Sequence, residues 1–170
     1  SPYSATKAAA DHLALAYHTT HGIDVVVTRC SNNYGPNQHP EKFIPLMITH
    51  AIEDKPLPVY GDGLYVRDWI HVTDHCRGLL AAVEEGVPGT VYNFGGDAER
   101  TNISVVEDIL EILDRPKNLI QHVQDRPGHD RRYAIDFSRA RDQLGWEPLT
   151  EFKEGLRNTV DWYIVHQDWW

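Results

Sequence analysis

The chain has 170 residues, of which 41% are hydrophobic and 24% charged, and its formal net charge is -9 at pH 7. This composition predicts one ordered domain with a sizeable core and excludes a largely disordered chain. The absence of an apolar run of about 18 residues excludes a membrane-spanning helix, and the negative charge argues against nucleic-acid binding.

The first predicted element is a helix over residues 4–20, which ends at Gly22. The apolar residues Ala8, Leu13, Ala16 and Tyr17 fall on one side of this helix. We expect the helix to pack on a part of the protein that lies outside this chain, so apolar surface should be exposed here and the chain should self-associate.

Tyr3 and Lys7 lie at the start of this helix, four residues apart, so they share one face. An ammonium beside a phenol favours the phenolate, and the pair could therefore act as a base near neutral pH. The alternative is an ordinary helix surface, on which an exposed Tyr and Lys at this spacing are common.

A short, mostly apolar strand is predicted over residues 23–28, as in a parallel sheet covered on both faces. The polar segment 29–38 follows it directly. Open α/β sheets bind ligands at the carboxyl ends of their strands, so this segment is predicted to be a ligand-binding loop.

The middle of the chain alternates between helices and strands. Thr73 is the expected N-cap of the second helix here. Cys76, Leu79, Leu80 and Val83 of that helix are predicted to point inward. The predicted elements are a helix over 40–53 with Pro45 near its first turn, strands at 57–60 and 66–72, a helix to Glu85 and a strand at 90–94.

The last third begins with a helix whose predicted N-cap is Ser104, because Glu107 three residues later completes a capping-box pattern. The remaining predicted elements are a strand at 119–123, a basic loop at 125–132, a strand at 133–137 and helices at 138–144 and 151–166. Arg126, Arg131 and Arg132 of the basic loop suit a small anionic ligand.

Cys30 and Cys76 match no zinc spacing and are too few for a disulfide framework, so we expect reduced thiols and a cytoplasmic location. His71 and His75 have the spacing of two ligands on a helix, but the residues before His71 are predicted to form a strand. No metal site is therefore predicted.

The chain contains no Gly-x-Gly-x-x-Gly loop for dinucleotide phosphates. It starts with neither Met nor a signal sequence, and Met47 is its one methionine. We therefore expect this chain to be the second half of an enzyme whose nucleotide loop precedes Ser1.

Six motifs along the whole chain resemble the extended short-chain dehydrogenase/reductase superfamily and, more narrowly, the carboxyl-terminal half of the dTDP-glucose 4,6-dehydratase family. The Tyr-x-x-x-Lys motif is common to the superfamily, whereas the second and last motifs favour the dehydratase. The motifs are SPYSATKA at 1–8, RCSNNYGP at 29–36, PEKFIPL at 40–46, VYGDG at 59–63, VRDW at 66–69 and DRPGHDRRYAID at 125–136.

The resemblance implies an α/β fold that combines the end of a Rossmann-like parallel sheet with a smaller α/β substrate-binding domain. Residues 1–36 would be the last part of the NAD-binding domain. Residues 37–170 would mainly bind the nucleotide sugar, with some segments returning to the Rossmann sheet. The full-length protein would be a homodimer.

The resemblance also implies roles in catalysis. Tyr3 would assist proton removal from the sugar C4 hydroxyl while NAD takes the hydride, and Lys7 would hold the nicotinamide ribose. Water loss across C5 and C6 and hydride return to C6 would give the 4-keto-6-deoxy sugar. The family's Asp and Glu for elimination would lie before Ser1, so we expect the chain alone to be inactive.

The remaining candidate residues would bind dTDP-glucose by resemblance, and Asn32 would also contact NAD. Five of the seven have a structural alternative: a turn contact for Asn32, surface ion pairs for Arg67 and Arg126, a core position for Tyr60 and a loop contact for His129. Lys42, Tyr60 and His129 are weaker assignments. The family match around Asn102 is looser because Ser104 stands where an acidic residue is frequent. The candidates are Asn32, Lys42, Tyr60, Arg67, Asn102, Arg126 and His129.

Two other functions fit parts of the pattern. Another NAD-dependent nucleotide-sugar epimerase or decarboxylase would share Tyr3 and Lys7 but would differ around residues 31–34 and 125–130. A non-catalytic, stand-alone module that binds a nucleotide sugar is the second alternative.

Overall fold

A computed structural model describes all residues, 1–170, as six α-helices, eight strands and two short 3-10 helices. The helices are α1 (Pro2–His21), α2 (Phe43–Ile52), α3 (Val72–Glu85), α4 (Asn102–Ile112), α5 (Ser138–Leu144) and α6 (Phe152–Val165). The strands are β1 (Val27–Cys30), β2 (Asn32–Tyr34), β3 (Leu57–Tyr60), β4 (Val66–His71), β5 (Val91–Phe94), β6 (Glu99–Thr101), β7 (Ile120–Val123) and β8 (Arg132–Tyr133). The 3-10 helices span Lys117–Leu119 and Gln167–Trp169.

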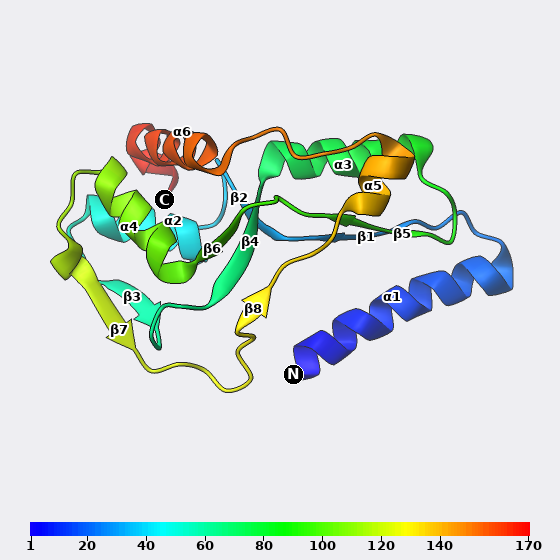
Figure 1. Ribbon diagram of the computed structural model, residues 1–170, viewed down its shortest axis with the longest axis horizontal. Helices are drawn as coiled ribbons and strands as arrows, with labels where there is room; N and C mark the ends of the chain where they lie inside the picture. Colours follow the sequence, from blue (N-terminus) through cyan, green and yellow to red (C-terminus); the bar gives the residue numbers. More distant parts are fainter.

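The strands form three small sheets, most of whose pairs are parallel. β1 pairs with β5, and β3 pairs with β7, in both cases in parallel. β4 is central to the third sheet, where it runs parallel to β2 and β8 and antiparallel to β6. Figure 1 shows α3 and α5 on one side of the β1–β5 pair and α1 on the other, with α2, α4 and α6 gathered at the opposite end of the molecule.

The buried apolar residues form two clusters. The larger cluster has 17 buried residues and lies mainly among α2, α4, α6 and β3. The smaller has seven and lies where α3 and α5 cover β5. The α/β fold with parallel strands expected from the sequence is therefore confirmed, and each end of the molecule has its own core.

Helix α1 has well-defined ends. The Ser1 hydroxyl accepts the Ser4 N–H, and Gly22 ends the helix in the left-handed region at φ 65°. None of its twenty residues is buried, and Leu13 and Tyr17 are 60% and 49% exposed. The exposed apolar surface expected for this helix is therefore confirmed.

The inward face predicted for α3 is wrong. The four residues expected inside are exposed, and the buried positions are Asp74, Gly78 and Ala82. The helix lies so close to β5 that a Cβ on Gly78 would come within 2.6 Å of the Phe94 ring. The close approach therefore selects small residues, and the larger apolar side chains point outward.

Two short polar strands, β2 and β6, lie in segments for which the sequence predicts no strand. Because β6 runs straight into α4, the N-cap is Thr101, whose hydroxyl accepts the Ser104 N–H, and the predicted cap at Ser104 is wrong. His71 likewise replaces Thr73 as the cap of α3.

Several predicted boundaries also shift. The first strand begins at Val27, not at residue 23, and the strand predicted at 133–137 is reduced to Arg132–Tyr133. The polar segment 29–38 contains the end of β1 and the whole of β2. It is therefore only partly a loop.

Candidate active site

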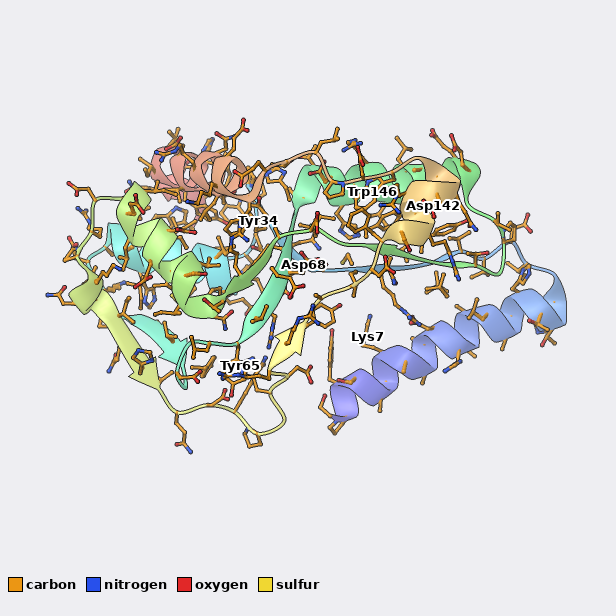
Figure 2. All side chains as sticks on the ribbon, viewed as in Figure 1. Lys7, Tyr34, Tyr65, Asp68, Asp142 and Trp146 are labelled. Atoms are coloured by element: carbon orange, nitrogen blue, oxygen red, sulfur yellow. The ribbon has the colours of Figure 1, made fainter.

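A cleft of about 1020 Å³ opens between the first half of α1, the end of β1 and the segment 126–133. This volume suits a ligand larger than a single sugar. In Figure 2 the Lys7 side chain points from α1 toward the strands across this opening. The lining residues are Ser1, Tyr3, Ser4, Lys7, Ala8, Asp11, Thr28, Arg29, Cys30, Arg67, Arg126, Pro127, Gly128, His129, Asp130 and Tyr133.

One side of the cleft is formed by α1 and β1, and we call it the helix wall. Tyr3 and Lys7 both line it, and helical spacing adds Asp11 to the same face. Arg29 Nε of β1 donates to Asp11 Oδ2 at 2.7 Å. This ion pair connects the otherwise exposed helix to the strand and so orients the Tyr3–Lys7 pair.

The other side is formed by β4, β8 and residues 126–130, and we call it the arginine wall. Arg67 donates through its two Nη atoms to the carbonyls of Val66 and Asp130, each at 2.7 Å. Burial lowers the pKa of Arg67. The guanidinium of Arg126 makes no hydrogen bond or ion pair within the chain and is therefore available to a ligand.

Asp125 organises the loop of the arginine wall. Its Oδ1 accepts hydrogen bonds from the Arg126 N–H and from His129 Nδ1, both at 2.8 Å. Its Oδ2 accepts a hydrogen bond from the Tyr65 hydroxyl. The His129 ring stacks on Tyr65 with centroids 4.2 Å apart, and its side chain is only 6% exposed. These contacts define the conformation of the loop.

The other two arginines of the basic loop point elsewhere. Arg131 forms a bidentate pair with Asp62 at 2.8 and 2.9 Å, and Arg132 forms one with Glu99 at 2.7 and 2.6 Å. Neither lines the cleft. Of the three arginines expected to bind one anionic ligand, only Arg126 therefore lines the cleft.

The cleft is basic although the chain is acidic. Its lining includes four Lys or Arg side chains and two Asp side chains, and one of these Asp, Asp11, is paired with Arg29. Lys7, Arg67 and Arg126 remain to face a ligand. Such a cleft favours an anion, and planar guanidinium groups match paired phosphate oxygens.

Five of the nine candidate residues therefore line the cleft, and four do not. Asn32 is half-buried in β2 opposite Trp69, and Lys42 pairs with Glu41 at 2.9 Å just before α2. The Tyr60 ring lies edge-on to His129 with centroids 6.1 Å apart, so it borders the arginine wall. Asn102 is buried at the start of α4.

Sequence reasoning missed the Asp11–Arg29 pair and Tyr133, whose hydroxyl donates to the Cys30 carbonyl at 3.1 Å. Asp11 carries a detectable signal, because it lies four residues after Lys7 on one helical face. Tyr133 carries none, since an aromatic residue in a short strand is typical of a core.

No three His, Cys, Asp or Glu side chains are grouped so that they could hold a metal ion. His71 ends β4 whereas His75 lies in α3. None of the helices combines the length and apolar character needed to cross a bilayer.

The Asp125 contacts predict a specific acid response. The Tyr65 hydroxyl, together with His129 and the Arg126 N–H, holds the pKa of Asp125 below its ordinary value. Because the folded-state pKa is lowered, the ionised Asp125 stabilises the fold above its unfolded-state pKa of about 3.9. This stabilisation is lost as the pH falls through the folded-state pKa. In an NMR titration, the Arg126 amide proton should therefore shift with a midpoint below about pH 3.9.

Asp125→Asn is the control for this titration, because an amide does not ionise in this range. The acid-dependent shift of the Arg126 amide should be absent from that variant. A wild-type midpoint at or above the ordinary value of an aspartate would contradict the proposed organisation of the loop.

Comparison with known proteins shows which family the chain matches. The sequence profile of GDP-mannose 4,6 dehydratase matches residues 1–159. A dTDP-glucose 4,6-dehydratase from Actinoplanes sp. is 54% identical over 170 residues, which are 100% of this chain and 53% of the relative. The chain thus spans about half the length of the curated relatives it matches.

Solved structures show the same relationship. The dTDP-glucose 4,6-dehydratase of Bacillus anthracis in complex with NAD superposes with a TM-score of 0.96 at 54% identity, over 100% of this chain and 54% of that one. A UDP-glucuronic acid 4-epimerase from Bacillus cereus, in complex with UDP-glucuronic acid and NAD, gives 0.92 at 30% identity, over 97% and 53%.

Proposed function

The chain belongs to the GDP-mannose 4,6 dehydratase family, and we propose that it provides the carboxyl-terminal part of an NAD-dependent dTDP-glucose 4,6-dehydratase. The main support is the cleft, which brings the Tyr3–Lys7 pair of the helix wall to face Arg67 and Arg126 of the arginine wall. Such a cleft can hold a sugar pyrophosphate with its sugar toward the phenol and its phosphates toward the guanidinium groups.

Tyr3 is the proposed catalytic acid and base at the sugar. Its phenolate takes the proton of the C4 hydroxyl as that carbon is oxidised, and Lys7 lies one turn away on the same helix face. Both lie on the helix wall, which Arg29 orients through Asp11.

NAD is the proposed cofactor, and it supplies hydride transfer, which no side chain can perform. The residues of the helix wall fit its ribose end, because the Lys7 ammonium and the Tyr3 hydroxyl are donors for ribose oxygens. Asn32, two residues beyond the end of β1, is the third proposed cofactor contact.

The nucleotide sugar is proposed to occupy the arginine wall. Arg67 and Arg126 would bind the diphosphate, and His129, held by Asp125, would donate to it. Substrate contacts are also proposed for the four candidates that do not line the cleft, namely Asn32, Lys42, Tyr60 and Asn102, of which Tyr60 lies edge-on to His129.

The domain division expected from the sequence is part of the proposal. Residues 1–36 would belong to the NAD-binding domain and residues 37–170 mainly to the nucleotide-sugar domain, with β5 returning to the first sheet beside β1. The exposed apolar residues of α1 support a homodimer, and two free cysteines support a cytoplasmic location.

The activity is tested with a hybrid enzyme in which this chain replaces the matching carboxyl-terminal half of the Bacillus anthracis relative. The hybrid should convert dTDP-glucose to the 4-keto-6-deoxy product in the presence of NAD. The 170-residue chain alone should not turn over. A hybrid that folds and binds NAD but forms no product would contradict the proposed function.

An epimerase remains the enzymatic alternative, because the epimerase neighbour shares the fold at a TM-score of 0.92. The identity of 54% to a dehydratase, compared with 30% to the epimerase, favours the dehydratase. Product analysis of the hybrid separates the two, since an epimerase returns a C4 epimer and no keto sugar.

A binding module is the non-enzymatic alternative, and the organised arginine wall favours it. Thermal stabilisation of the chain by dTDP would show binding by mass action. Binding by the chain together with an inactive hybrid would support this alternative.

Arg67→Ala is expected to weaken dTDP binding by about 1.5–3 kcal/mol, which is the range for hydrogen bonds to charged groups. Arg67 lines the cleft and points its two Nη atoms at backbone carbonyls that a diphosphate can replace. Calorimetric titration of dTDP into the chain and its variants measures the loss.

Arg157→Ala is the matched control, because Arg157 is an exposed arginine of α6 outside the cleft. Its dTDP affinity should equal that of the unmodified chain. Equal affinities for Arg67→Ala and Arg157→Ala would mean that Arg67 has a structural role only.

A further inference from the structure

Asp68 is only 2% exposed and does not line the cleft, so its carboxylate is buried in the fold. It accepts hydrogen bonds from the Ser31 hydroxyl, from the Gly96 N–H at 2.9 Å and from the Ala98 N–H at 2.8 Å. All three donors are neutral. Burying a carboxylate is costly, so these bonds must hold it in one fixed place.

The three donors come from connections between two sheets. Ser31 is the single residue between β1 and β2, whereas Gly96 and Ala98 lie between β5 and β6. Asp68 itself is in β4, directly after Arg67. Figure 2 shows Asp68 where β4 meets the ends of β1 and β5. One carboxylate therefore joins the β1–β5 pair to the sheet of β4 at two connections.

The connection between β5 and β6 fits tightly against β4. A Cβ on Gly96 would lie 1.7 Å from the Trp69 carbonyl oxygen, a distance no real Cβ tolerates. A Cβ on Gly95 would lie 2.9 Å from the Ile135 carbonyl oxygen and 3.2 Å from Asp68 Oδ2. The two glycines thus allow the backbone to reach the carboxylate.

The same two sheets carry the two walls of the cleft. The helix wall is attached to β1 through the Asp11–Arg29 pair, and the arginine wall includes Arg67 of β4. Catalysis needs Tyr3 of the first wall and the diphosphate contacts of the second wall at a fixed separation.

We propose that Asp68 is a positioning residue that sets the helix wall relative to the arginine wall through its bonds to Ser31, Gly96 and Ala98. The expected effect of Asp68 on kcat rests on the proposed function. Its expected effect on the separation of the two sheets rests on the fold alone. Asp68→Asn keeps the shape of the side chain, but its amide group faces backbone N–H donors and cannot accept all three bonds.

The geometric consequence is tested on the 170-residue chain by electron spin resonance. Nitroxide labels at Glu84→Cys in α3 and Asp161→Cys in α6, with Cys30 and Cys76 replaced by Ser, report the separation of the two sheets. Both label positions are exposed. Asp68→Asn should broaden or shift the distance distribution, and an unchanged distribution would overturn the proposal.

The control is Val106→Ala, which truncates a fully buried side chain of the larger core that makes none of the hydrogen bonds to Asp68. It should lower thermal stability but leave the distance distribution unchanged. Equal broadening in both variants would show general loosening of the fold, and the positioning role would be rejected.

The kinetic consequence is tested in the hybrid enzyme. A misplaced catalytic group can cost about 100-fold, so kcat of Asp68→Asn should fall by roughly that factor. The Kd for dTDP should stay within about threefold, because Arg67 and Arg126 lie on the same wall and keep their relative positions. Val106→Ala should preserve both values below its melting temperature.

Unchanged kcat in Asp68→Asn, or parallel loss of kcat and dTDP affinity, would overturn the positioning role. An unmodified hybrid without dehydratase activity would instead contradict the proposed function. The distance measurement on the chain then decides the role of Asp68 independently.

Discussion

Tyr3→Phe should lower kcat of the hybrid enzyme by about 10²–10⁴-fold, the usual contribution of a general acid or base. The change removes a single oxygen atom from a side chain that lines the cleft and is largely exposed in the chain. It should therefore leave folding and dTDP affinity intact. Steady-state kinetics with dTDP-glucose, together with calorimetry of dTDP binding, separates the two effects.

Tyr17→Phe is the matched control, because Tyr17 is on the same helix but outside the cleft. Its kcat should equal that of the unmodified hybrid. Full activity of Tyr3→Phe would mean that the proton of the C4 hydroxyl goes to another group, and the assignment of the helix wall would have to be abandoned.

The helices were the most predictable part of the fold because their signals are local. In α1 the Ser1 hydroxyl caps the first turn, Pro2 suits the first helical position and Gly22 ends the helix, so residues adjacent in sequence define both ends. The short strands β2 and β6 lack any such signal. They are polar segments of three residues each that become strands only because β4 lies beside them, so their hydrogen-bond partners are distant in sequence.

The direction in which helix faces point was harder to predict. A row of apolar residues shows which face could be buried, but the neighbours decide which face is buried. In α3 the backbone lies against the Phe94 ring at Gly78, so the small residues are inside and Val83 is outside. In α1 no segment of this chain covers Leu13 and Tyr17.

The candidate site could likewise be predicted only in part. Helical spacing was enough to group Tyr3 with Lys7, and their cleft is where the structure places Arg67 and Arg126. The engagement of Arg131 by Asp62, 69 residues earlier, could not be read from the sequence. Charge counts identify candidate anion contacts, but ion pairs within the fold decide which of them face a ligand.

Leu156→Ala is expected to lower the free energy of unfolding by about 2–5 kcal/mol, as is usual when a buried leucine is truncated. Leu156 is 0% exposed in α6 and belongs to the larger core cluster with residues of α2 and α4. The change removes apolar contacts and leaves a cavity that close-packed neighbours can fill only in part. Urea denaturation of the 170-residue chain, followed by circular dichroism, measures the loss.

Leu149→Ala is the control for Leu156→Ala, because Leu149 is 67% exposed just before α6. The same atoms are removed there from a position already in water, so the free energy of unfolding should change by less than about 0.5 kcal/mol. If the two variants lost equal stability, the packing of α6 against α2 and α4 would be absent in solution. The β4 strand that carries Arg67 would then lack the support that fixes the arginine wall, because α6 packs on β4 as well.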